Sequence, residues 1–84
     1  VILILLPILA VVPLALLYKL LMFMALMGIL IAEAINSAIE RVTDLVTLEY
    51  HEMAGRAKDA GSAVVFLSIA VCVVVWVFCL AQLI

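Results

Sequence analysis

Apolar residues form three runs along the chain, and helix-breaking or polar residues separate them. The first run, "VILILLPILAVV" at 1–12, is followed by Pro13, and proline is best tolerated in the first turn of a helix. We therefore predict a first segment over 1–12 and a second helix from Pro13 to about Val46. The alternative boundary lies at Tyr18 and Lys19, which would lengthen the first segment and shorten the second.

A third apolar segment follows the main polar stretch of the chain. Residues 47–61, "TLEYHEMAGRAKDAG", hold two glycines and half of the charged residues, and predict a polar connection. From Ser62 to Ile84 the chain is uncharged, and this segment is long enough for a helix to cross about 30 Å of hydrocarbon. The segment 1–12 would extend only about 18 Å as a helix, so it cannot span unaided.

Composition indicates that these helices belong to a membrane protein. Hydrophobic residues make up 73% of the chain and charged residues 12%, whereas about a quarter of the residues in soluble domains are charged. We predict an all-α integral membrane protein, one domain over 1–84 with three transmembrane helices, of which the first is truncated. The four cations form no cluster, which argues against a nucleic-acid partner. Cys72 and Cys79 lie about 10 Å apart along a helix, so we expect packing rather than a disulfide.

The distribution of cations predicts the orientation in the membrane. Arg41, Arg56 and Lys58 flank the polar connection, whereas Lys19 lies near the other end of its helix and would extend back to the nearer interface. The positive-inside rule therefore places the connection in the cytoplasm. Glu33 would lie about 30 Å along the helix from Pro13, at the cytoplasmic edge of the membrane.

A polar stripe runs along the end of the second helix. Its members share one face by their spacing: Glu33, Asn36, Ser37, Glu40, Arg41 and Asp44. One interpretation is a polar seam between helices or subunits. The other assigns chemistry, because an ionisable residue within an apolar helix is a functional candidate by default. Glu33 would then be a base at the membrane edge, and the more hydrated Glu40 a ligand of a hard cation such as Mg²⁺.

The block "EYHEMAGRAKDAGS" at 49–62 contains side chains that suit a polyphosphate. It offers carboxylates, an imidazole, a guanidinium and an ammonium, which phosphoryl transfer uses to bind phosphates and Mg²⁺. Neither common glycine-rich phosphate-loop pattern is present in the sequence. We expect His51 to form hydrogen bonds rather than to bind a metal, since it is the only histidine.

Two motifs, "AEAINSAIERVTD" and "EYHEMAGRAKDAGSAVV", together resemble the paired signature of the prokaryotic diacylglycerol kinases, small membrane lipid kinases. The resemblance implies a homotrimer of three-helix protomers in the bacterial inner membrane, surrounded by membrane lipids. It implies transfer of the ATP γ-phosphate to diacylglycerol, giving phosphatidic acid, with Mg²⁺ as cofactor and the site facing the cytoplasm.

The resemblance also implies roles for individual residues. Glu33 would be the catalytic base that meets the lipid, Asn36 a catalytic partner and Glu40 the magnesium ligand beside the nucleotide. The remaining residues implied to contact the nucleotide are Glu49, Tyr50, His51, Lys58 and Asp59. Those implied to contact the lipid are Ser62, Trp76 and, near the opposite interface, Lys19.

Family members also carry a surface helix and a metal-binding glutamate before the first full span, and neither has a counterpart here. We therefore expect the chain to begin within the first span and, as it stands, to be impaired in activity. Two alternatives stay open. One is an undecaprenol kinase, a related enzyme with another lipid substrate, and the other is a non-enzymatic membrane assembly protein.

Overall fold

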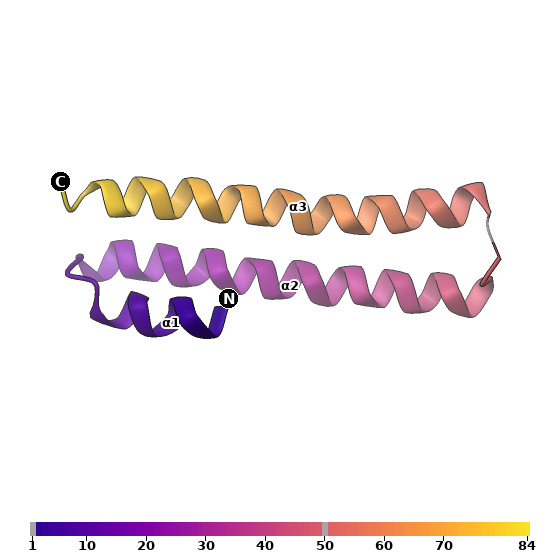
Figure 1. Cartoon of the computed structure of the whole chain (residues 1–84), viewed down its shortest axis with the longest axis horizontal. Helices are drawn as coiled ribbons and strands as arrows, with labels where there is room; N and C mark the ends of the chain where they lie inside the picture. The colour runs from indigo at the N-terminus through magenta and orange to yellow at the C-terminus, as the bar shows by residue number, and fades with distance from the viewer. Residues whose placement is uncertain (1, 50) are drawn as a thin grey trace.

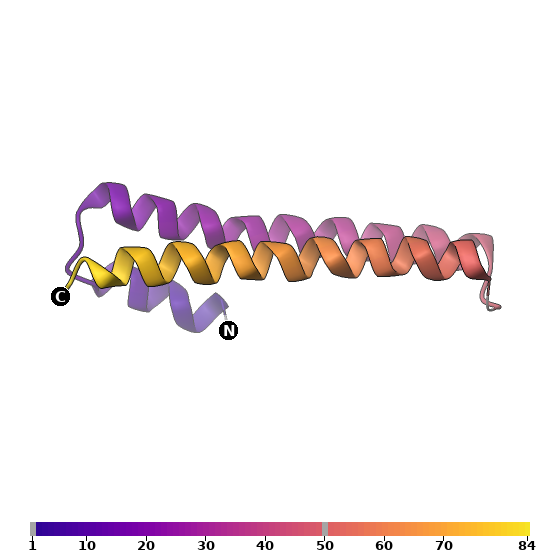
Figure 2. The same ribbon diagram turned by 90° about the horizontal axis from the view of Figure 1, so that it is seen from above.

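The computed structural model describes residues 2–49 and 51–84, which form three helices. They are α1 (Ile2–Val11), α2 (Leu16–Val46) and α3 (Glu52–Ala81). Helices α2 and α3 lie side by side as a long antiparallel hairpin, and α1 folds back against the first part of α2 (Figure 1; Figure 2). The structure measures 51 × 18 × 17 Å, so its long axis exceeds the roughly 30 Å of a hydrocarbon core.

The predicted break at Pro13 is confirmed, but α2 begins three residues later, at Leu16. A proline disfavours helical geometry in the residue before it, which ends α1 at Val11. The N–H of Leu14 then donates to the carbonyl of Val12 at 2.9 Å, and this tight turn reverses the chain before α2 begins. The alternative boundary at Tyr18 is wrong, because Tyr18 lies inside α2.

The end of α2 at Val46 is as predicted, but the polar connection is much shorter than the expected 47–61. Helix α3 already begins at Glu52, where His51 Nδ1 accepts a hydrogen bond from the N–H of Met53 at 3.1 Å and caps the helix. An ion pair of 2.9 Å between Arg56 and Glu52 supports the first turn. The charged half of the predicted connection is therefore helical and lies alongside the end of α2.

Helices α2 and α3 keep one antiparallel register along the hairpin. Near the chain ends, Cys79 Sγ lies 3.8 Å from the carbonyl oxygen of Tyr18. Farther along, Gly61 lies against the side chain of Asn36. Asn36 comes 18 residues after Tyr18, and Gly61 comes 18 residues before Cys79, so the facing positions advance in step.

The best-buried core lies where all three helices meet. It contains Leu9, Val12, Met22 and Cys79, and Trp76 packs against it. The indole N–H of Trp76 donates to the main-chain oxygen of Met22 at 3.1 Å, which joins α3 to α2. This end of the hairpin is stabilised by packing, and the other end carries the charges.

Much of the outer surface is apolar. Large hydrophobic side chains are exposed along all three helices, for example Leu3, Leu16 and Phe66. Helices α2 and α3 are each long and apolar enough to cross a membrane, whereas α1 has 10 residues and is shorter. The expectation of an all-helical chain is confirmed, with two candidate spans and one short apolar helix.

Candidate functional site

Polar side chains of α2 and α3 meet in the half of the hairpin next to the connection. Asn36 Nδ2 donates to Glu40 Oε1 at 3.2 Å, one turn farther along α2. Lys58 Nζ, from α3, donates to Asp44 Oδ1 at 2.7 Å. The spacing of Asn36, Glu40 and Asp44 places them on one face of α2, as the sequence predicts. We call these four residues the polar cluster.

The cluster has a defined charge arrangement. The hydrogen bond to Asp44 and then the negative charge of Asp44 raise the pKa of Lys58, and the charge of Glu40 adds a smaller contribution. Lys58 is therefore cationic throughout the physiological pH range. Both side chains of the Lys58–Asp44 pair are nearly half exposed, at 45% and 46%. The cluster thus presents one cation and two carboxylates to the surface, a combination that suits a metal-bound phosphate.

Asn36 connects this cluster to the helix interface. Its Oδ1 atom is buried and has no hydrogen-bond partner among the described residues. A Cβ atom on Gly61 would overlap that oxygen and would also contact Ile39 Cδ1 at 3.4 Å. The absence of a side chain at Gly61 therefore makes room for the amide of Asn36.

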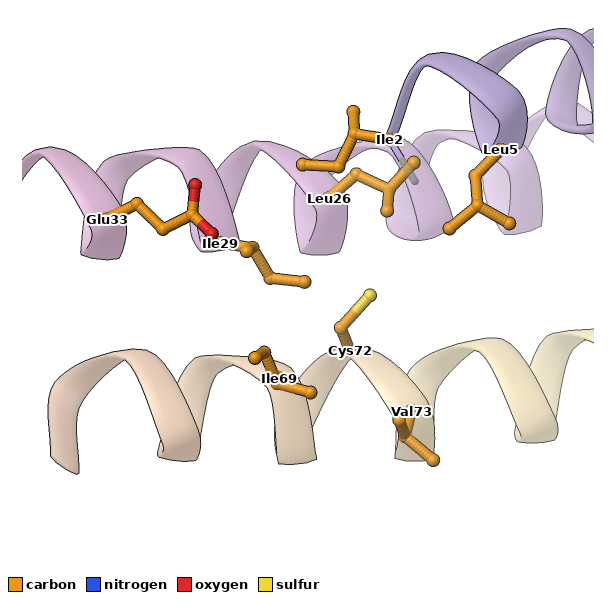
Figure 3. A pocket seen from close by; sticks show the side chains of 8 residues that line it. All are labelled: Ile2, Leu5, Leu26, Ile29, Glu33, Ile69, Cys72 and Val73. Carbon is orange, nitrogen blue, oxygen red and sulfur yellow. The ribbon is translucent and has the colours of Figure 1, made fainter. Parts of the chain in front are cut away.

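Glu33 lies one turn before Asn36 and lines an apolar cavity of about 350 Å³. The other lining residues come from all three helices: Ile2, Leu5, Leu26, Ile29, Ile69, Cys72 and Val73. In Figure 3 Glu33 lies at one end of this group, while Ile2 and Leu5 of α1 approach from the side opposite α3. The Glu33 side chain is itself exposed at the edge of this cavity.

Several predicted nucleotide residues line a second hollow, of about 310 Å³, at the connection. Glu49, His51 and Lys58 all contribute to it. His51 uses Nδ1 for the cap of α3, and its Nε2 has no hydrogen-bond partner among the described residues. Asp59 and Ser62 are exposed on α3 in the same half of the hairpin. Tyr50, also predicted to contact the nucleotide, lies outside the described residues.

Two residues predicted to contact the lipid lie in the other half of the hairpin. Lys19 donates from Nζ to the carbonyl of Ala10 at 3.1 Å, near the end of α1. It lies about 21 Å along α2 from Glu33. Trp76 lies in the packed core at the same end. The structure therefore gathers the polar cluster and Glu33 in one half, and Lys19 and Trp76 in the other.

Sequence reasoning missed two features of the site. It treated Asp44 and Lys58 separately, and their pairing depends on the hairpin register. It also treated Gly61 as part of a flexible loop, whereas Gly61 contacts Asn36 across the helix interface. The available signal was the position of Gly61 directly before a long apolar segment, where glycine permits close backbone approach.

Glu40 offers one carboxylate ligand for a magnesium ion. No group of three or more acidic, histidine or cysteine side chains gathers closely enough to hold a metal within 2–49 and 51–84. Mg²⁺ is commonly held by one or two carboxylates together with substrate phosphates and waters. An exposed carboxylate with one oxygen anchored by Asn36 is compatible with that mode of binding.

Together, the two long apolar helices and the charged cluster at one end define a small helical membrane protein with a polar site on its hairpin. A family model described as "Prokaryotic diacylglycerol kinase" matches residues 1–80. The chain therefore belongs to the prokaryotic diacylglycerol kinase family, as the resemblance of the two motifs indicated.

Individual relatives agree with this assignment. The chain is 48% identical over 58 residues to the diacylglycerol kinase of Escherichia coli K12. The aligned region covers 69% of this chain and 48% of that protein. It is 43% identical over 56 residues to the diacylglycerol kinase of Haemophilus influenzae, covering 67% of this chain and 48% of that protein. The chain thus spans about half the length of the curated relatives it matches.

Proposed function

We propose that the protein is a lipid kinase that transfers the γ-phosphate of ATP to the free hydroxyl of diacylglycerol, giving phosphatidic acid and ADP. One observation carries the proposal. Glu33, which borders an apolar cavity, lies on the same helix face as Asn36 and Glu40 and two turns or less from both. A base beside an apolar cavity and next to a charged cluster suits a substrate with acyl chains and a reactive hydroxyl.

The reaction needs a proton acceptor, and we assign this role to Glu33. The lipid hydroxyl oxygen attacks the γ-phosphorus, and the bond between this phosphorus and the oxygen that bridges to the β-phosphate breaks. The hydroxyl proton passes to the carboxylate of Glu33, and ADP leaves with the electron pair of the broken bond. A positioned base contributes about 100-fold to 10,000-fold in such steps.

Residues of the polar cluster and the connection would bind the nucleotide. Lys58 supplies a permanent cation for the phosphates, and Glu49 and His51 line the adjacent hollow. Glu40 would hold Mg²⁺, which neutralises phosphate charge when it is bound. Asn36 would orient the Glu40 carboxylate through its hydrogen bond.

The setting we propose is a homotrimer in the bacterial inner membrane, with the connection on the cytoplasmic side. Three cations lie at the connection end of the hairpin, namely Arg41, Arg56 and Lys58. The remaining cation, Lys19, lies near the opposite end. The exposed apolar side chains of α2 and α3 would contact lipid or neighbouring protomers.

The proposal is tested by incubating the protein in mixed micelles with radiolabelled ATP, Mg²⁺ and either diacylglycerol or undecaprenol. We expect label in phosphatidic acid and a clear preference for diacylglycerol. A preference for undecaprenol would identify the related enzyme instead. Absence of label in both lipids, for this chain and for a version extended at its N-terminus, would contradict a kinase and favour the polar seam of an assembly protein.

A further inference from the structure

Gly61 differs from the other two glycines in what surrounds it. A Cβ atom added to Gly28 or Gly55 would meet nothing within 4 Å. A Cβ atom added to Gly61 would overlap Asn36 Oδ1 and would lie 3.4 Å from Asn36 Cγ. The closest contact at Gly61 is therefore with the end of one polar side chain, and Ile39 Cδ1, at 3.4 Å, is the next neighbour.

Two contacts together determine which way the amide of Asn36 faces. A carboxylate only accepts hydrogen bonds, so the NH₂ group of Asn36 must face Glu40, to which it donates at 3.2 Å. The amide oxygen then faces Gly61, where it is buried without a hydrogen-bond partner among the described residues. Because a Cβ built at Gly61 would overlap this oxygen, only a hydrogen of Gly61 Cα occupies that direction. The position of the amide thus depends on both helices.

We propose that Gly61 is a positioning residue that orients Glu40 through Asn36. With no side chain at Gly61, the Asn36 amide stays in the interface between α2 and α3 and anchors one oxygen of Glu40. The other oxygen of Glu40 has no hydrogen-bond partner among the described residues and would bind the hard cation. The assignment of the cation to Glu40 rests on the proposed function, whereas the Gly61–Asn36–Glu40 arrangement rests on the contacts alone.

Substituting alanine at Gly61 should move Asn36 rather than prevent folding. The overlapping atom is the far end of a side chain, which rotates away more easily than a backbone segment shifts. Rotation of the amide breaks its hydrogen bond to Glu40. The Glu40 carboxylate then loses its anchor, and supports of this kind typically change metal affinity about tenfold or more.

A first experiment examines the amide directly, without metal or substrate. Asn36 is the one asparagine in the chain. Labelling with ¹⁵N-asparagine therefore gives one side-chain amide nitrogen, with its two protons, in the NMR spectrum. Gly61→Ala should shift both amide protons and broaden or move the nitrogen resonance. Gly28→Ala, the matched control, should leave them in place. An unchanged signal in Gly61→Ala would overturn the proposal.

A second experiment measures the binding of Mn²⁺–ADP through the relaxation of water protons, with metal-free ADP as a reference. Gly61→Ala and Asn36→Ala should each weaken Mn²⁺–ADP binding about tenfold and leave metal-free ADP binding unchanged. The double variant should also be about tenfold weaker rather than about a hundredfold, because both changes remove the same anchor. Gly28→Ala should bind normally.

The outcomes separate this proposal from the proposed function. If Glu40→Gln weakens Mn²⁺–ADP binding but Gly61→Ala does not, the positioning role is wrong and the cation assignment stands. If the losses in the double variant multiply, Gly61 acts independently of Asn36 and the proposal is overturned. If Glu40→Gln binds as the wild type does, the cation assignment fails, and the amide signal of the first experiment alone decides the positioning role.

Discussion

Replacing Trp76 by phenylalanine should destabilise the packed end of the hairpin by a predictable amount. The indole N–H donates to the main-chain oxygen of Met22 at 3.1 Å, and the ring packs on the core formed by Leu9, Val12, Met22 and Cys79. Phenylalanine keeps most of the ring contact but removes the donor. Met22 lies within α2, where its carbonyl has a helical partner, so no polar group is left unpaired.

The expected cost of Trp76→Phe follows from these contacts. A hydrogen bond between membrane helices contributes about 0.6 kcal/mol on average and up to about 1.7 kcal/mol. We therefore expect a loss of about 1 kcal/mol. Trp76→Ala also empties part of the core and should cost about 3 kcal/mol or more.

The assay is unfolding by increasing SDS in mixed micelles, followed by far-UV circular dichroism. Phe66→Leu is the matched control, because Phe66 also lies on α3 but is 71% exposed in this chain. The stabilities should follow the order wild type and Phe66→Leu, then Trp76→Phe, then Trp76→Ala. A Trp76→Phe variant as stable as the wild type would refute the assigned hydrogen bond. A Phe66→Leu variant as unstable as Trp76→Ala would refute the assigned core.

Two further predictions concern the lysines at opposite ends of the hairpin. Asp44 raises the pKa of Lys58. The stability that this pair contributes is therefore complete below the unfolded-state pKa of lysine. It is lost as the pH rises through the raised pKa of the folded state. The stability difference between wild type and Lys58→Met should therefore be constant from pH 7 to about pH 10 and shrink above it; a difference that vanishes by pH 8 would contradict the pairing. Lys19→Met removes the hydrogen bond to Ala10 and should accelerate hydrogen exchange in α1 but not in the middle of α3; equal rates in both proteins would show that this bond does not hold α1.

Local signals in the sequence predict the helices better than they predict the connection between them. Pro13 and the apolar runs indicate where α1 ends and where α2 continues to Val46, because these depend on backbone sterics and hydrophobic periodicity. The start of α3 at Glu52 was not predicted. Gly55 and Gly61 locally disfavour a helix, and packing against α2 outweighs that preference.

In the candidate site, too, contacts within one helix can be predicted from the sequence, whereas contacts between helices cannot. The spacing of Glu33, Asn36, Glu40 and Asp44 is sufficient to predict a shared helix face, because residues on one helix have fixed relative positions. The pairing of Asp44 with Lys58 depends instead on how far α3 slides along α2. That register is set by long-range contacts and by the short connection, which a single sequence does not specify.

The most direct test of the central claim is phosphate transfer by a Glu33→Gln variant, with ATP binding measured on the same preparation. Glutamine has nearly the same shape as glutamate but cannot accept the proton from the lipid hydroxyl. We predict that transfer to diacylglycerol falls at least about 100-fold while the affinity for Mg²⁺–ATP stays within about twofold of the wild type. A variant that phosphorylates diacylglycerol at the wild-type rate would contradict the assignment of Glu33 as the base.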